Sequence, residues 1–284
     1  MFERVEVAGG PREQAPDLRE RPVEVGGCRG SLIEAGEGPP LVLLATMLVR
    51  SRPYAPVIRR LARHFHVYAV DMPGCGRASR LRETWGFERY AAWADRLLDQ
   101  LRLEQVTLVG HSNSAGTELV MGALYPDRLA RIVLADTVGG DASPSSFRVL
   151  LGRALDAFLE PWLSLTGWHH LFYNALLHTR SFFGQVRLSI ETDLRPYAPR
   201  VTLPVLLAWG ARDHTMPLRC AHALESLLPN ASLHVAPTGS HDWIITHAAE
   251  FGAVVDEWAK NECGSASRPT GPLKRTLQSG RRVP

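Results

Sequence analysis

The segment from Gln105 to Met121, QVTLVGHSNSAGTELVM, constrains the fold of this 284-residue chain more than any other. Residues 105–109 are mostly apolar and β-branched, which is typical of a parallel strand covered on both faces. Gly110 follows directly and helical spacing is established by Thr117, so no loop fits between them. The pattern predicts a strand, a tight turn that presents Ser112, and a helix whose first N–H groups point toward that serine.

This turn resembles the nucleophile elbow of the α/β-hydrolase superfamily, with Ser114 and Ala115 where glycine is more usual. Three further stretches follow the family's pattern. The sequence DMPGCGRAS at 71–79 is similar to its D-x-P-G-x-G-x-S turn, the run 210–217 resembles its acid loop, and Gly-Ser-His at 239–241 resembles its catalytic histidine loop. The chain thus resembles the lidded serine esterases and lipases of this superfamily.

Buried strands are predicted at 41–45, 65–70, 105–109, 131–135, 203–210 and 231–236, with amphipathic helices between most of them. Such alternation implies β-α-β crossovers and an α/β fold with a doubly wound, mostly parallel sheet. A hairpin with a Gly26-Gly27 turn is predicted at 21–34. From 141 to 200 helical patterning with large apolar side chains replaces the alternation, where the resembled family carries a helical lid.

These features divide the chain into four parts. We expect a flexible N-terminal arm at 1–20, an α/β-hydrolase core at 21–140 and 201–260, a helical lid at 141–200, and a basic disordered tail at 261–284. Residues 260–284 contain six Lys or Arg against one acid, Glu262, a charge of +5, so the rest of the chain carries −2 of the total +3. The nearly neutral body gives no reason to expect nucleic-acid binding.

Cysteine spacing and apolar runs exclude several other classes. Four scattered cysteines without a C-x-x-C pair argue against a disulfide scaffold or a metal site. The first ten residues lack the apolar stretch of a signal peptide, and the longest apolar run, 41–49, is far shorter than the roughly 20 residues of a membrane span. We therefore expect a cytoplasmic protein without a membrane span, metal or cofactor, and its oligomeric state stays open.

The resemblance implies a catalytic triad of Ser112, Asp213 and His241, each of which follows a predicted core strand. A serine hydroxyl needs a base within hydrogen-bond reach, and that base needs a carboxylate to fix its tautomer. Because the carboxyl ends of parallel strands meet at one edge of a sheet, we expect the three side chains to converge there.

Each of these roles has an alternative. Ser114 is the alternative candidate for the nucleophile, in a shifted S-x-S-x-G frame that ends at Gly116. Asp136, which also follows a core strand, is a second candidate for the triad carboxylate. His111 and His214 are the other candidates for the base.

The oxyanion hole is expected to consist of the backbone N–H groups of Asn113 and Met47. Members of the family usually have His-Gly after the first core strand, followed by the residue whose N–H is used. This chain has Ala45-Thr46-Met47 instead, and threonine does not adopt glycine's unusual dihedrals freely. Met47 as an ordinary core residue is the alternative.

Substrate specificity is expected to lie in the lid. Six aromatic residues are candidates for the substrate pocket: Trp162, Trp168, Phe172, Phe182, Phe183 and Trp243. The apolar lid indicates a small, hydrophobic, uncharged substrate, and the resemblance implies carboxylesterase-type cleavage of a hydrophobic ester through an acyl-serine intermediate. Carbon–carbon bond hydrolases, lactonases and perhydrolases share the triad, and a receptor-like member with weak turnover is a further alternative.

Overall fold

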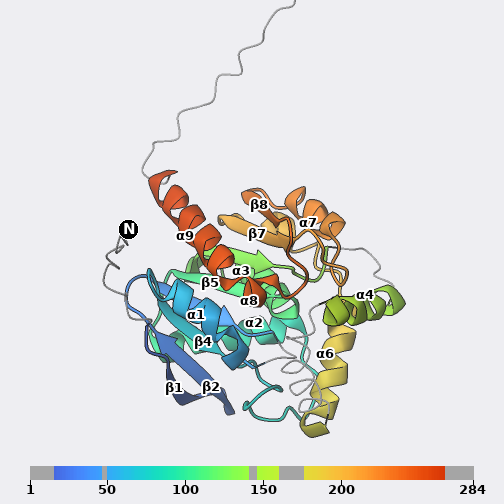
Figure 1. The fold of residues 1–284 in the computed structure, drawn as a ribbon. Helices are drawn as coiled ribbons and strands as arrows, with labels where there is room; N and C mark the ends of the chain where they lie inside the picture. Colours follow the sequence, from blue (N-terminus) through green and yellow to red (C-terminus); the bar gives the residue numbers. More distant parts are fainter. Residues whose placement is uncertain (1–15, 47–49, 141–145, 160–175, 266–284) are drawn as a thin grey trace, which may run out of the picture.

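The computed structural model describes residues 16–46, 50–140, 146–159 and 176–265 (Figure 1). Its centre is one eight-stranded sheet with the order β1-β2-β4-β3-β5-β6-β7-β8. The strands are β1 (Arg19–Val25), β2 (Cys28–Ala35), β3 (Pro40–Leu44), β4 (His66–Val70), β5 (Val106–His111), β6 (Leu129–Ala135), β7 (Val205–Gly210) and β8 (Ala231–Ala236).

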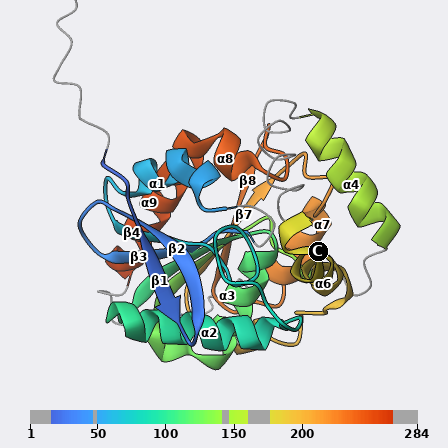
Figure 2. The same cartoon turned by 90° about the horizontal axis from the view of Figure 1, so that it is seen from below.

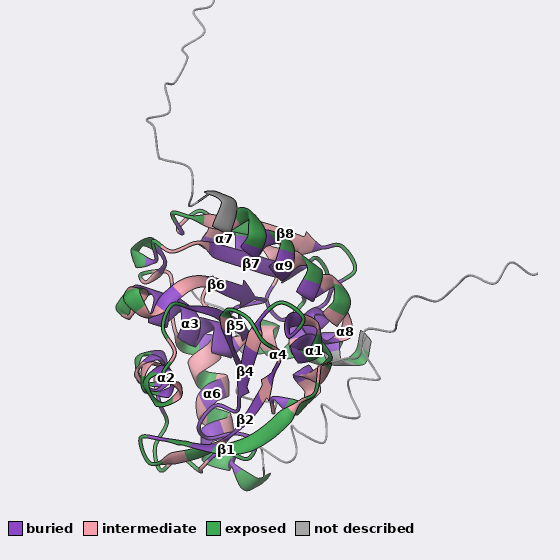
Figure 3. Ribbon diagram, turned by 90° about the vertical axis from the view of Figure 1, so that its left-hand side faces the viewer, coloured by how far each residue is buried: buried purple, intermediate pink, exposed green. Residues whose placement is uncertain are grey.

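The sheet is antiparallel only at its N-terminal edge. β1 and β2 form the predicted hairpin around Gly26 and Gly27, whose φ angles of 57° and 77° suit glycine. β2 also runs antiparallel to β4, and every other pair is parallel. β1 is exposed along most of its length, whereas the central strands are buried (Figure 3). The predicted mostly parallel sheet is therefore confirmed.

Helices cover both faces of the sheet (Figure 2). The helices are α1 (Ala55–Leu61), α2 (Phe87–Leu101), α3 (Asn113–Leu124), α4 (Ser146–Leu159), α6 (Thr179–Glu191), α7 (Leu218–Glu225), α8 (Trp243–Thr246) and α9 (Ala248–Ser265), with short 3-10 helices at Arg52–Tyr54, Pro126–Arg128 and Ala198–Arg200.

Two apolar cores result, because successive strand residues point to opposite faces. On β3, Val42 and Leu44 belong to the core that also contains side chains of α2, α3 and α7. Leu41 and Leu43 belong to the core that contains side chains of α1, α8 and α9. This two-sided burial explains why the central strands read as continuous apolar runs rather than alternating ones.

Two predicted boundaries were wrong. The helix expected to end at Lys260 continues to Ser265, so residues 261–265 are not part of a disordered tail. Gly and Ser there suggested disorder, but the first proline beyond the helix is Pro269, so no proline blocks the helical hydrogen bonds earlier. At the other end, Arg19 and Glu20 pair with Glu34 and Ile33, so the final residues of the expected arm belong to the sheet.

Between β6 and β7 the chain leaves the sheet and forms α4 and α6 (Figure 1). α4 contacts the loops that follow β7 and β8, which places it at the carboxyl edge of the sheet. α6 packs against the loop after β4 and against α2, where its buried Gln185 donates to the Tyr90 hydroxyl at 3.0 Å.

Candidate active site

Ser112 occupies a sharp turn between β5 and α3. Its φ of 59° and ψ of −124° are rare for a residue with a side chain, so the surrounding structure must hold it there. The neighbours leave little space: a Cβ on Gly110 would lie 2.4 Å from the Glu118 carboxyl group. The buried Ser114 hydroxyl accepts from the His111 N–H at 3.0 Å and lies 2.8 Å from the Leu44 carbonyl, so it braces the turn.

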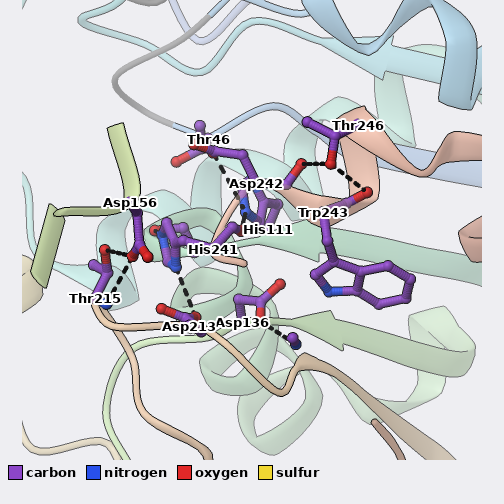
Figure 4. Close-up of polar contacts among 12 residues, drawn as sticks. Thr46, His111, Asp136, Asp156, Asp213, Thr215, His241, Asp242, Trp243 and Thr246 are labelled. Carbon is purple, nitrogen blue, oxygen red and sulfur yellow. Dashed lines mark hydrogen bonds and ion pairs between the residues drawn. The ribbon is translucent and has the colours of Figure 1, made fainter. Parts of the chain in front are cut away.

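His241 connects Ser112 to Asp213. Its Nε2 lies 3.0 Å from Ser112 Oγ. Its Nδ1 lies 2.9 Å from Asp213 Oδ2 (Figure 4). The other oxygen of Asp213 accepts from the Met216 N–H at 2.7 Å, which fixes the carboxylate. Because a carboxylate can only accept, Nδ1 carries the proton and Nε2 is left to accept from the serine hydroxyl. The structure thus brings Ser112, His241 and Asp213 together.

Burial and charge act in opposite directions on His241. Burial disfavours the charged imidazolium, but the Asp213 carboxylate and its hydrogen bond outweigh burial, so the pKa of His241 lies above its usual value. The ring can therefore take up a proton more readily than burial alone would allow.

The alternative acid, Asp136, lies next to this group without contacting the imidazole nitrogen. It follows β6, and its Oδ1 accepts from the Gly210 N–H at 2.9 Å. The proton of His241 Nδ1 is directed to Asp213 instead.

His111, the residue before the serine, links the turn to the histidine loop. Its ring Nε2 lies 2.8 Å from the His241 carbonyl and its Nδ1 lies 2.7 Å from the Tyr54 hydroxyl. Since the carbonyl can only accept, Nε2 carries the proton and Nδ1 accepts from Tyr54. Burial, with repulsion from His241, lowers the pKa of His111 to about 4. His111 is therefore a neutral side chain that supports the loop of the candidate base. In the sequence, its position next to Ser112 was the feature that pointed to a role in the site.

One residue of α4 holds the acid loop. Asp156, which is 1% exposed, accepts from the Thr215 N–H at 2.9 Å, the Thr215 hydroxyl at 2.6 Å and the His214 ring at 2.8 Å. Gly152 allows this close approach, because a Cβ there would lie 2.0 Å from the His214 carbonyl oxygen. The sequence pattern did not point to Asp156, because α4 is distant from the acid loop along the chain.

A second residue of α4 pairs with the neighbour of His241. Arg153 Nη1 lies 2.6 Å from Asp242 Oδ2. Burial alone would raise the pKa of Asp242, but Arg153, followed by the imidazoles of His241 and His111, lowers it to about 2. Asp242 is thus a carboxylate neutralised by Arg153 beside the candidate base.

The predicted oxyanion groups are only partly within the described structure. Met47 lies outside the described residues. Asn113 is the first residue of α3, and its side-chain oxygen accepts from the Thr46 hydroxyl at 2.7 Å. The Thr46 side chain thus ties the segment after β3 to the first residue of α3.

The pocket candidates fall into three groups. Trp162, Trp168 and Phe172 lie outside the described residues. Phe182 and Phe183 meet edge to face on α6, with ring centroids 5.3 Å apart, and Phe183 is 62% exposed.

The prediction for Trp243 was wrong. Its indole is fully buried and packs edge to face against Phe251 of α9, with centroids 5.6 Å apart. α8 starts directly after the histidine loop and directs this ring into the core on the α1/α9 face, away from His241 (Figure 4).

Within the described ranges, no cluster of three or more His, Cys, Asp or Glu side chains is arranged to hold a metal ion. Among the helices that the structure describes, none combines the length and apolar character needed to cross a membrane.

The family model described as "alpha/beta hydrolase fold" matches residues 39–162. A protein of Caulobacter sp. (strain K31), provisionally named as a carbamate hydrolase, is 28% identical over 74% of this chain and 86% of its own. The pimeloyl-[acyl-carrier protein] methyl ester esterase of Vibrio vulnificus (strain CMCP6) is 24% identical over 76% of this chain and 92% of its own.

A solved structure has the same fold. The serine hydrolase involved in carbazole degradation, the CarC enzyme, superposes with a TM-score of 0.74 at 21% identity, covering 86% of this chain and all of that one.

Proposed function

Since the chain belongs to the α/β-hydrolase superfamily, we propose that it is a serine hydrolase. In this proposal Ser112 is the nucleophile, His241 is the general base, and Asp213 is the carboxylate that supports His241. The observation that carries this proposal is the unbroken hydrogen-bond series from Ser112 Oγ through both nitrogens of His241 to Asp213. It lies in a largely buried site behind a strained turn, where ionisable groups act more strongly on one another than in water.

The reaction follows from this arrangement. His241 Nε2 takes the proton of the Ser112 hydroxyl as Oγ attacks a substrate carbonyl carbon, and Asp213 stabilises the imidazolium. Collapse of the tetrahedral intermediate breaks the bond to the leaving alcohol, which receives the proton from His241. His241 then removes a proton from water as the water oxygen attacks the acyl-serine carbonyl carbon. It returns that proton to Ser112 Oγ as the bond to the acyl group breaks and the carboxylic acid leaves.

The negative oxygen of the intermediate is held by the backbone N–H of Asn113, at the positive end of α3, together with that of Met47. The hydrogen bond from Thr46 to the Asn113 side chain supports this assignment, because it joins the two segments that would supply the donors.

The substrate class is a hydrophobic, uncharged carboxylic ester. In this proposal α4 and α6 belong to a cap at the carboxyl edge of the sheet, with Phe182 and Phe183 as candidate wall residues. Trp162, Trp168 and Phe172 are further candidates and lie outside the described residues. The attachment of α4 to the acid loop supports a cap at this position. The relatives named for an ester and a carbamate both point to attack on a carbonyl group attached to a heteroatom.

The test uses p-nitrophenyl esters of increasing chain length and a fluorophosphonate that labels activated serines. Ser112→Ala is expected to lose at least about 10³-fold of kcat and all phosphonate labelling. Ser114→Ala is the matched control, and it should still be labelled at Ser112. Labelling of the Ser112→Ala variant at the wild-type rate contradicts the assignment.

The acid is tested separately. Asp213→Asn is expected to lower kcat by about 10³- to 10⁴-fold, because it removes the charge that stabilises the imidazolium and fixes its tautomer. A loss below about tenfold contradicts this role for Asp213.

A second candidate function is a receptor-like protein that binds a similar ligand with weak turnover. The observation that favours it is Thr46 in place of the family's usual glycine, with its hydroxyl hydrogen-bonded to the Asn113 side chain. Ester binding without measurable hydrolysis would favour the receptor, and multiple turnover would exclude it.

A further inference from the structure

We propose that Asp136 carries a proton and donates a hydrogen bond to the Asp213 carboxylate, so that one neutral and one charged carboxyl group together support His241. Asp136 is a positioning residue in this arrangement, because it acts on the imidazole through Asp213. The inference rests on the proposed function, since it concerns the acid of the same triad.

The first support is the way Asp136 is held against the strand that leads to the acid. β6 and β7 are parallel neighbours, and Asp136 directly follows β6. Its backbone N–H donates to the Ala208 carbonyl at 3.1 Å, and its Oδ1 accepts from the Gly210 N–H at 2.9 Å. Its φ of 45° is uncommon for a residue with a side chain, although Asp and Asn tolerate it best. The carboxyl group is therefore fixed beside Asp213 (Figure 4).

The second support is the number of donors available to the two carboxyl groups. Both oxygens of Asp213 are occupied, Oδ1 by the Met216 N–H and Oδ2 by His241. Asp136 is fully buried, and no donor in the described parts of the chain reaches its Oδ2. The Asp213 carboxyl group lies beside that of Asp136 (Figure 4). A carboxylate in such a position would leave a buried charge without a donor, whereas a carboxylic acid turns Oδ2 into a donor with an acceptor beside it.

The charges around the pair favour the same state. Burial first, and then the Asp213 carboxylate, raise the pKa of Asp136 well above its usual value, and the Gly210 N–H opposes them only in part. Two carboxylates that share one site do not both ionise readily.

Three other titratable or charged groups face His241. Asp242 is neutralised by Arg153 from α4, and His111 is a neutral imidazole with a pKa lowered to about 4. If Asp136 is neutral as well, Asp213 carries the single uncompensated charge among the groups named here that face His241.

The first experiment detects the proton without requiring activity. Infrared difference spectra at pH 7 compare the wild-type protein with Asp136→Asn, and we expect a protonated-carboxyl band that the variant lacks. Glu118, whose carboxyl oxygens are buried without a hydrogen-bond partner in the described structure, should supply a second such band. Glu118→Gln is therefore the matched control, because it should remove only that second band. Loss of a carboxylate band in Asp136→Asn, with every protonated band retained, overturns the proposal.

The second experiment uses the pH dependence of kcat/KM for p-nitrophenyl butyrate. Asp136→Asn keeps an acceptor for Gly210 and a donor for Asp213, so a loss of less than about threefold is expected, with an unmoved acid limb. Asp136→Ala removes both groups, and a loss of about 10- to 100-fold is expected, as for a hydrogen bond to a charged group. Thermal unfolding checks that each variant folds; if Asp136→Ala does not, the Asn profile and the infrared bands still decide.

An ionised Asp136 predicts a different profile. Asparagine would then remove a negative charge beside His241, lower the pKa of the imidazole, and move the acid limb downward by about one pH unit. That shift, or full activity of Asp136→Ala, contradicts the inference while leaving the triad intact. A wild-type protein that neither hydrolyses esters nor reacts with the phosphonate contradicts the proposed function instead, and the infrared measurement still tests the proton.

Discussion

Acidification between pH 6.5 and 4 should destabilise the fold through His111. The side chain is 1% exposed, both ring nitrogens are engaged, and its pKa falls from the usual 6.5 to about 4. In the unfolded chain the same imidazole is hydrated and takes up a proton near its usual pKa. Over this pH range the unfolded state therefore binds a proton that the folded state excludes, and acid favours unfolding.

The magnitude follows from the two pKa values. The difference between 6.5 and about 4 is about 2.5, and each unit corresponds to about 1.36 kcal/mol, so His111 should remove about 3 kcal/mol of unfolding free energy by pH 4. Because the folded-state pKa is the lower one, stability is complete above pH 6.5 and is lost as the pH falls toward 4. This is a large part of the roughly 5–15 kcal/mol by which a domain is usually stable.

Urea unfolding of the wild-type protein and His111→Asn at pH 7.5, 6.5, 5.5 and 4.5 measures this effect. Asparagine keeps one donor and one acceptor but does not titrate, so between pH 7.5 and 4.5 the wild-type curve should fall by about 2.5 kcal/mol more than the variant curve. His241 changes in the opposite sense, since its raised pKa favours the folded state as the pH falls, and it is present in both proteins. Asp242 stays ionised until about pH 2. Parallel stability curves for the two proteins would refute a neutral buried His111.

Two further predictions concern packing around the site. Asp156→Ala should lower the free energy of unfolding by about 2–3 kcal/mol in urea titrations, since the N–H and hydroxyl of Thr215 lose their acceptor. Asp156→Asn keeps one side-chain oxygen and should lose less stability. An equal loss in both variants would contradict this role of Asp156. Gly110→Ala should destabilise the folded protein by about 1–3 kcal/mol, because its methyl group would be forced against the Glu118 carboxyl group. Glu118→Ala in the same chain should restore most of that stability. Strictly additive losses in the double variant would exclude the clash as the cause.

Local pattern located the core elements closely. The amphipathic stripe at 87–101 coincides with α2, and the apolar run at 231–236 coincides with β8. The hairpin was predicted from Gly26-Gly27, and the elbow from a strand that meets a helix at Ser112. These features depend on residues within a few positions of one another, through strand alternation, helical period and turn chemistry, so the chain order displays them directly.

The directions of side chains in the loops were harder to predict from the sequence. Trp243 follows the histidine loop and was expected in a pocket, but α8 turns its ring into the opposite core. Nothing in the local sequence of α4 indicated that Arg153 and Asp156 would hold the loops around His241 and Asp213. Both outcomes depend on how separate segments pack.

The order of amino acids therefore specified an α/β sheet with a serine on a strained turn, and the positions of a carboxylate and an imidazole after later strands, because these follow from local hydrogen bonding and periodicity. Tertiary packing alone decided that Asp213 rather than Asp136 reaches His241, that His111 bridges to its carbonyl, and that α4 braces both loops. Residues 28 to 130 positions apart meet there. A choice between two buried carboxyl groups depends on orientations that no short stretch of sequence encodes.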